Sequence, residues 1–150
     1  MRDGGLRLGL IVPSSNTTME SELTRVLPDW ISLHTSRIRL VDVDERSLAA
    51  MEEGVERAAL ELADAEVDLI LFGCTTGSLI GGKGYDRMIA DRITSATGIE
   101  AVTTSTAVLR ALEALAARKI SVATPYIDGV NEAERRFLEE NGFEVLRIRG

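Results

Sequence analysis

The stretch V-D-L-I-L-F-G-C-T-T-G-S, residues 67–78, decides how the rest of the sequence is interpreted. Val67–Phe72 is the most hydrophobic strand candidate in the chain, and such a short apolar run is typical of a strand buried on both faces. It leads directly into Gly73, Cys74 and a series of small hydroxyl residues, which predicts a functional turn followed by a helix. In open parallel sheets, ligands bind beyond the carboxyl ends of strands such as this one.

Strand and helix patterns alternate on both sides of this stretch. Further strands are predicted at 6–12, 30–40, 100–102, 120–123 and 143–148, and helices at 17–27, 44–65, 85–97, 103–117 and 128–141. Thr17 and Glu20 have the spacing of a capping box, Asp128 is a candidate cap, and a phase slip before Ile38 predicts a bulge. The order βαβαβαβαβαβ predicts an α/β fold, a mostly parallel sheet with helices on both faces in three αβα layers.

Composition excludes several classes of protein. The 150 residues are 45% hydrophobic and 27% charged, which suits a globular domain with a real core. The net charge of −7 and the scattered basic residues argue against partners such as nucleic acid or anionic membranes. One cysteine and one histidine exclude an internal disulfide and a Cys- or His-rich metal site, and the cytoplasm is the expected compartment.

Four predicted strand ends are rich in small hydroxyl and amide side chains. Because each leads toward a helix, backbone N–H groups and side chains could together hold a small anion, most plausibly a carboxylate. The alternative is that these residues are simply good helix caps. The four loops are Ser14-Ser15-Asn16-Thr17, Thr75-Thr76-Gly77-Ser78, Thr103-Thr104-Ser105-Thr106 and Thr124-Pro125-Tyr126.

Cys74 has two interpretations. At the end of a central strand its thiol can be exposed, with helix N-termini that lower its pKa; alternatively it is packed and inert. His34 lies in a strand-like stretch and is a poor candidate for its base, which disfavours a papain-like pair.

Residues 77–83 have a phosphate-loop spacing, but Gly84 stands where magnesium binding needs Ser or Thr. Other side chains are given structural roles: Arg37, Arg39 and Lys83 at the surface, and Trp30, Phe72, Phe137 and Phe143 in the core.

Six motifs in this order resemble those of the maleate cis-trans isomerases, in the Asp/Glu racemase superfamily that also contains arylmalonate decarboxylases. They are G-L-I-V-P-S-S-N-T-T-M-E at 9–20, H-T-S-R-I-R-L at 34–40, L-F-G-C-T-T-G-S at 71–78, G-K-G-Y-D at 82–86, T-T-S-T-A-V at 103–108 and A-T-P-Y-I-D-G-V-N-E at 123–132. The resemblance implies two similar flavodoxin-like lobes with an active site between them. Residues 1–117 would form most of the first lobe, and 118–150 the start of an incomplete second lobe.

The resemblance also implies roles for individual residues. Cys74 matches the first of the family's two active-site cysteines, and the second would lie beyond residue 150. Asn16 matches a substrate contact in the loop that also holds Ser14 and Ser15, and Tyr126 matches a carboxylate-binding Tyr. Thr75 and Thr76 match a hydroxyl pair that supports a carboxylate or enediolate. The decarboxylase branch lacks cysteine at the position of Cys74, so cysteine there favours isomerase or racemase chemistry.

The expected function is therefore conversion of maleate or a similar cis-enedioate to its trans isomer through a thiolate adduct, without metal or organic cofactor. A truncated chain would be weak or inactive by itself. Alternatives are an amino-acid racemase, a decarboxylase-like enzyme, or a non-catalytic domain that binds small carboxylates. The identity of the diacid and the oligomeric state, with a homodimer as one option, stay open.

Overall fold

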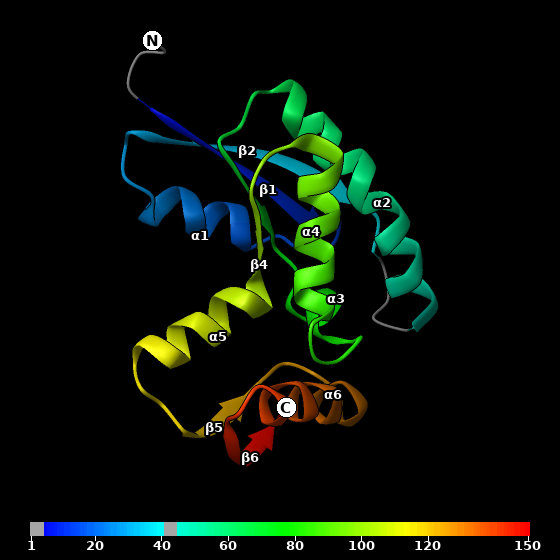
Figure 1. Ribbon diagram of the computed structural model, residues 1–150, viewed down its shortest axis with the longest axis vertical. Helices are drawn as coiled ribbons and strands as arrows, with labels where there is room; N and C mark the ends of the chain where they lie inside the picture. Colours follow the sequence, from blue (N-terminus) through cyan, green and yellow to red (C-terminus); the bar gives the residue numbers. More distant parts are fainter. Residues whose placement is uncertain (1–4, 41–44) are drawn as a thin grey trace.

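The computed structural model describes residues 5–40 and 45–150, and for residues 45–53 it describes the backbone alone. Twelve helices and strands succeed one another along these residues, and parallel strands alternate with helices as expected (Figure 1). In chain order they are β1 (Leu6–Pro13), α1 (Met19–Val26), β2 (Ile31–Ile38), α2 (Glu45–Asp64), β3 (Leu69–Phe72), α3 (Thr75–Leu79), α4 (Tyr85–Thr97), β4 (Ala101–Thr103), α5 (Thr104–Ala114), β5 (Lys119–Ala123), α6 (Asp128–Glu140) and β6 (Glu144–Arg149).

The strands form two sheets, and every pairing in both is parallel. The larger sheet has the order β2-β1-β3-β4, so that β1 and β3 are its central strands. The smaller sheet consists of β5 and β6, with a register shift between Ile120 and Ser121. The α/β class with parallel strands is confirmed, but the strands do not continue into one sheet.

Helices cover the larger sheet on both faces, as predicted (Figure 1). On one face, Ile11, Ile70 and Phe72 of the sheet pack with α2 and α4 in one buried apolar cluster. On the other face lies α1, whose Met19 comes so close to Gly73 that a Cβ there would sit 2.6 Å from its sulfur. Gly73 therefore allows α1 to approach the end of β3.

A second apolar cluster joins the smaller sheet to the rest of the chain. Phe137 and Leu138 of α6 pack there with Val145 of β6 and with Leu79, the last residue of α3. Cys74, directly before α3, belongs instead to the cluster of the larger sheet. The five-residue helix α3 thus connects two hydrophobic cores (Figure 1).

Two predicted helix caps are wrong. The Thr17–Glu20 capping box does not form, because the N-cap residue of α1 is Thr18, which makes no side-chain capping hydrogen bond, and the Glu20 carboxylate pairs with Arg37. Asp128 lies in the first turn of α6, and Ile127 is the cap residue.

Two predictions around β2 are also wrong. β1 and β2 pair without interruption from Leu6↔Ile31 to Pro13↔Ile38, so there is no bulge. Trp30 was expected in the core, but it lies in the turn before β2 and is 58% exposed. Phe72, Phe137 and Phe143 are buried as predicted. The apolar residues Leu48 and Met51 of the predicted helix 44–65 belong to the part whose side chains lie outside the description.

We expect Phe72→Ala to lower the free energy of unfolding by about 3–5 kcal/mol, because a buried aromatic side chain would leave a cavity. Phe72 is 1% exposed and ends β3, whereas Leu115, the control, is 77% exposed. Urea unfolding followed by circular dichroism gives both values. Equal losses for Phe72→Ala and Leu115→Ala would contradict the assigned core.

Candidate active site around Cys74

Cys74 stands at the junction of β3 and α3. It is the N-cap residue of α3, with an extended backbone (φ −140°, ψ 104°), and its Sγ accepts a hydrogen bond from the Gly77 N–H at 3.3 Å. The β3 strand places it there, because parallel pairing with β1 continues one residue past the strand, where the Gly73 N–H donates to the Ile11 carbonyl at 2.7 Å. The sulfur is therefore held next to a backbone N–H group.

The surroundings of the thiol differ from the expectation. Cys74 is only 9% exposed and packs among aliphatic side chains, so it is not an open thiol at the sheet edge. Burial raises the pKa of Cys74, and the hydrogen bond from Gly77 lowers it by a smaller amount. The expected lowering of this pKa by helix N-termini is therefore wrong as a net effect, because desolvation of the thiolate outweighs the nearby N–H.

Asn16 is fixed by the start of α1. Its Oδ1 accepts hydrogen bonds from the backbone N–H groups of Thr18 at 3.1 Å and Met19 at 2.9 Å. The Arg37 guanidinium donates to the Asn16 carbonyl at 2.9 Å. A side chain with Oδ1 engaged in this way still has its two Nδ2 protons to donate. Asn16 thus accepts two backbone hydrogen bonds just before α1, and its Nδ2 protons are still able to donate.

The two serines of the same loop differ. Ser14 accepts from the Leu40 N–H at 3.1 Å through Oγ, and its own N–H donates to the Ile38 carbonyl at 2.7 Å, so it ties the β1 loop to the end of β2. Ser15 is exposed. Arg37 donates to the Ser14 carbonyl at 3.1 Å and pairs with Glu20, in agreement with its predicted structural role.

The hydroxyls at the start of α5 bind other parts of the protein. Thr103 caps the helix through the Thr106 N–H at 3.1 Å, and Thr104 donates to the Phe72 carbonyl at 3.1 Å. Ser105 contacts the Thr75 carbonyl at 3.2 Å, and Thr106 donates to a carboxylate oxygen of buried Asp86 at 2.5 Å. This loop is therefore scaffold, not the predicted ligand cradle.

Tyr126 is half-buried in the loop after β5. The Asn131 side chain of α6 is buried and donates to the Tyr126 carbonyl at 3.1 Å, while Thr124 accepts from the Tyr126 N–H at 3.1 Å. Hydrogen bonds to Thr124 and Tyr126 thus engage both ends of the Asn131 side-chain amide. These hydrogen bonds, like those of Asn16, fix the loop backbone, so a meeting of both side chains with Cys74 around one substrate stays a prediction.

Thr75 and Thr76 differ from the other loop residues. Thr76 is buried and Thr75 half-buried, both within the first turn of α3. Neither side-chain hydroxyl makes a hydrogen bond to another residue within the described part of the chain. They remain available to a ligand.

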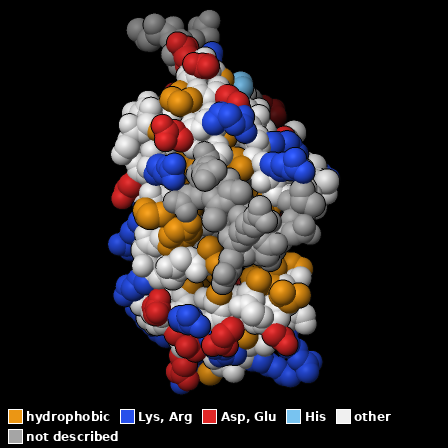
Figure 2. Space-filling view, turned by 90° about the vertical axis from the view of Figure 1, so that its right-hand side faces the viewer, with side chains coloured by type: hydrophobic (Ala, Val, Ile, Leu, Met, Phe, Trp, Pro, Cys, Tyr) orange, Lys and Arg blue, Asp and Glu red, His pale blue; other side chains and the backbone are white. Residues whose placement is uncertain are grey.

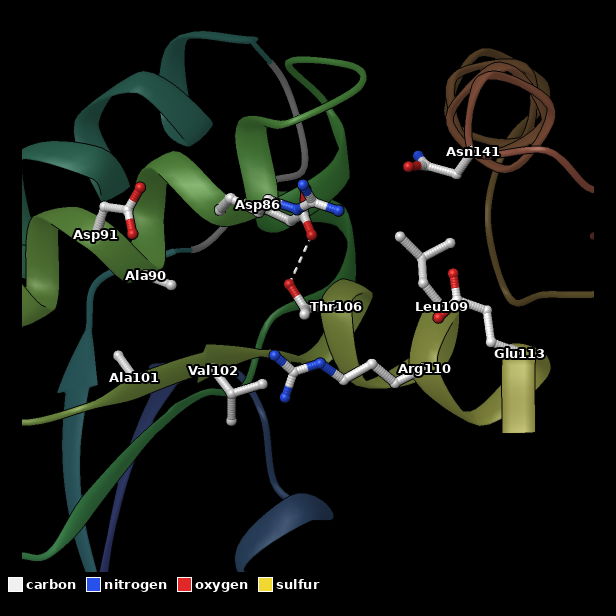
Figure 3. Close-up of a pocket in the computed structure, with 11 residues that line it drawn as sticks. Asp86, Ala90, Asp91, Ala101, Val102, Thr106, Leu109, Arg110, Glu113 and Asn141 are labelled. Carbon is white, nitrogen blue, oxygen red and sulfur yellow. Dashed lines mark hydrogen bonds between the residues drawn. The ribbon is translucent and has the colours of Figure 1, made fainter. Parts of the chain in front are cut away.

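A cavity of about 360 Å³ lies between α4, β4 and α5 (Figure 3). Its charges are mixed: the Arg110 guanidinium and the Asp86 carboxylate reach toward it, and Asp91 and Glu113 also line it. Cys74 is not among its lining residues. Asp86 accepts the hydrogen bond from Thr106 and so supports α5. Sequence patterns did not predict a role for Asp86. Its position as an acidic residue in the first turn of a predicted helix is the feature that could have indicated one.

Surface charge, candidate metal ligands and helix hydropathy are further features of the described part of the chain that bear on ligand binding. On the face shown in Figure 2, basic and acidic side chains are interspersed. Within residues 5–40 and 45–150 no group of three His, Cys, Asp or Glu residues could hold a metal ion. None of the described helices is long and apolar enough to cross a membrane.

Lys83 was expected to be solvated, and it is exposed. Its Nζ nevertheless donates to the Glu140 carbonyl at 2.8 Å, and its backbone N–H donates to the Glu140 carboxylate at 3.1 Å. Lys83 therefore ties the glycine-rich loop to the end of α6.

We predict slow alkylation of Cys74 by iodoacetamide in the folded chain at neutral pH, and faster alkylation in concentrated urea. The pKa of the thiol is raised in the folded state, so the thiolate is scarcer there than in the unfolded chain. Because the pKa of Cys74 is higher in the folded chain than in the unfolded chain, the protonated thiol contributes to the free energy of unfolding below the unfolded-state pKa. This contribution is lost as pH rises through the folded-state pKa. Intact mass reports the rate for this one cysteine; equal rates in both states would contradict the burial.

We expect Asn16→Ala to lower the free energy of unfolding by about 1 kcal/mol, because the N–H groups of Thr18 and Met19 at the start of α1 lose their acceptor. Asn16→Asp keeps an acceptor oxygen next to the helix N-terminus and should stay within a few tenths of a kcal/mol of the parent. Urea unfolding of both variants tests the assignment, and an Ala variant as stable as the Asp variant would show that these hydrogen bonds are unimportant.

Comparison with known proteins places this chain in a known family. The family model for arylmalonate decarboxylase matches residues 8–150. A maleate isomerase of Pseudomonas putida is 36% identical over 93% of this chain, and one of Nocardia farcinica is 34% identical over 93%. An arylmalonate decarboxylase of Bordetella bronchiseptica is 32% identical over 89%. The chain spans about 60% of the length of both isomerases and 55% of the decarboxylase.

Solved structures agree with these matches. The Nocardia farcinica maleate cis-trans isomerase, as a Cys-to-Ser mutant with a covalently bound succinylcysteine intermediate, superimposes with a TM-score of 0.91. It is 32% identical, and the match covers 97% of this chain and 63% of that chain. The expected fold is confirmed, and because the family model matches nearly the whole sequence, the chain belongs to the arylmalonate decarboxylase family.

Proposed function

We propose that this chain supplies the nucleophilic half of an enzyme that converts maleate, or a similar cis-enedioate, to its trans isomer without a cofactor. The observation that carries the proposal is the position of Cys74, held before α3 by the Gly77 N–H and followed in the first turn by two threonines whose hydroxyls are unengaged. A relative with 32% identity carries a succinylcysteine, which corresponds to the enediolate adduct of such a reaction after a proton is added at carbon.

In the proposed reaction the Cys74 thiolate adds to one carbon of the double bond. The electron pair of the double bond moves toward the adjacent carboxylate, so a C–S bond forms and an enediolate carries the extra charge. Rotation about the resulting single bond and expulsion of the thiolate give the trans alkene. No atom is gained or lost over the cycle.

The residues around the thiol fit the needs of this step. Burial raises the pKa of Cys74 and makes the thiolate scarce at neutral pH, whereas the Gly77 N–H favours the thiolate. The Thr75 and Thr76 hydroxyls can donate to the developing enediolate. Asn16 would orient a carboxylate through its Nδ2 protons, since Oδ1 is engaged by α1. Ser14 is engaged with Leu40, so from this loop Ser15 is the better candidate for a further donor.

The remaining parts of the proposal concern the whole enzyme. With one cysteine in the sequence, a second thiol would come from outside these 150 residues. Residues 1–117 and 118–150 would belong to two lobes with Tyr126 contributed by the second, and the chain by itself would turn over weakly. A small dicarboxylate as ligand, a cytoplasmic location and a homodimer are kept as predictions.

Decarboxylation is the alternative supported by a specific observation, the match to an arylmalonate decarboxylase. It would release carbon dioxide from an arylmalonate. Racemisation would carry solvent deuterium into the α-position of an amino acid or related acid. In a non-catalytic carboxylate-binding domain, alkylation of Cys74 would be slow and unaffected by maleate.

We expect the chain to form a single adduct with maleate at Cys74, visible as a mass increase of one maleate and absent in Cys74→Ser. The control reagent is acrylamide, which reacts with thiols but lacks carboxylates. The ratio of the maleate rate to the acrylamide rate should be higher in the folded chain than in urea, because a built site recognises the dianion. A ratio that is no higher in the folded chain would refute the proposal.

A further inference from the structure

Two buried serines lie directly behind the turn that carries Cys74. Ser78, on α3, is 0% exposed, and Ser105, on α5, is 2% exposed. Their hydroxyl oxygens are 2.7 Å apart, although 27 residues separate them in the sequence. The Ser78 hydroxyl also reaches the carbonyls of Cys74 at 2.8 Å and Thr75 at 3.0 Å, and Ser105 reaches the Thr75 carbonyl at 3.2 Å.

The protons available to this pair limit how it can bond. Each hydroxyl donates one proton and accepts with its lone pairs. If Ser105 donates to Ser78, then Ser78 is free to donate to the Cys74 or Thr75 carbonyl. If Ser78 donates to Ser105 instead, Ser105 donates to the Thr75 carbonyl. In both arrangements one serine hydroxyl donates to a carbonyl of the Cys74–Thr75 turn. In both, the hydrogen bond between the two serines needs Ser105.

The turn needs such support, because α3 has only five residues. A helix this short is not stable by itself, since nucleation costs more than its few hydrogen bonds return. By contrast α5 has eleven residues, and its start is anchored to β3 by Thr104 and to α4 by Thr106. Ser105 therefore links the short helix to a firmly held one.

The first turn of α3 in turn determines what Cys74 touches. The Sγ accepts from the Gly77 N–H, and this bond exists only while residues 74–77 keep their helical geometry. Ser78 continues the same turn, as its N–H donates to the Cys74 carbonyl at 3.1 Å. Loss of the serine pair would thus weaken the N–H contact to sulfur.

We propose that Ser105 is a positioning residue for Cys74, which acts with Ser78 to hold the turn that presents the sulfur to the Gly77 N–H. Ser105 does not touch the sulfur and carries no step of the reaction. Its importance for catalysis rests on the proposed function, but its effect on the thiol does not.

The test is the pH profile of Cys74 alkylation by iodoacetamide in Ser105→Ala, measured by intact mass on the full 150-residue chain. Burial and the Gly77 N–H are the influences on the thiol pKa, in that order. A weaker N–H contact should move the midpoint of the profile to higher pH and slow alkylation below the midpoint about three- to tenfold. Ser78→Ala should shift the profile in the same direction, and the double variant should not exceed the larger single effect.

Thr106→Val is the matched control. It removes a half-buried hydroxyl from the same turn of α5, but one that is bonded to Asp86, so it should cost stability and shift the profile less than Ser105→Ala does. If Ser105→Ala does not fold, the proposal is judged on whether Ser78→Ala moves the midpoint of the alkylation profile to higher pH. The proposal is overturned if the profile of folded Ser105→Ala matches that of the parent, if alkylation becomes faster, or if Thr106→Val shifts the profile equally.

These outcomes are independent of the maleate experiment, because iodoacetamide is neutral and needs no carboxylate site. A chain that shows the shift but does not favour maleate over acrylamide would retain the positioning role and lose the isomerase proposal. A chain that favours maleate without the shift would retain the isomerase proposal and lose the role of Ser105.

Discussion

The parallel pairing of β1 with both β2 and β3 is the constraint on which the candidate site depends. Strands that run in one direction end at one edge, so the loop after β1 and the turn after β3 emerge next to each other. Backbone bonds extend both pairings past the strands: the Gly73 N–H binds the Ile11 carbonyl, and the Ser14 N–H binds the Ile38 carbonyl. Any slip in register would move Cys74 away from this edge, since a single residue reverses the side on which each side chain lies.

Much of the fold could be predicted because it follows from local periodicity. The helix Tyr85–Thr97, ended by Gly98 with φ 72°, was predicted to the residue. The predicted bulge in β2 is wrong, because the change in hydrophobic phase along this strand has another cause. Leu33 pairs with Leu8 on one face of the sheet, whereas Ile38 lies on the opposite face in the cluster with α2. An edge strand whose two ends are covered on opposite faces needs no bulge to change its hydrophobic phase.

The site was predictable in position but less so in detail. Sequence patterns located Cys74 and the polar loops, since small hydroxyl residues after a predicted strand can be recognised from the sequence alone. Their partners are not, because they come from distant segments: Ser14 meets Leu40, Ser105 meets Thr75, and Thr106 meets Asp86. A hydroxyl committed to a backbone carbonyl cannot serve a ligand without losing that bond. The same limit applies to the thiol, whose burial depends on α2 and α4 and decides the direction of its pKa.

The short helix α3 connects the chemistry to the packing. Its preceding residue, Cys74, belongs to the core of the larger sheet, and its last residue, Leu79, belongs to the core built by α6 and the smaller sheet. A shift between the two cores would therefore act directly on the turn that holds the sulfur. Ser78 and Ser105 oppose such a shift from the side of α5, and Lys83 opposes it through its two hydrogen bonds to Glu140 at the end of α6. Since interactions that act on one short element are coupled, the serine pair and the Lys83 contacts together determine how firmly the turn that carries Cys74 is held.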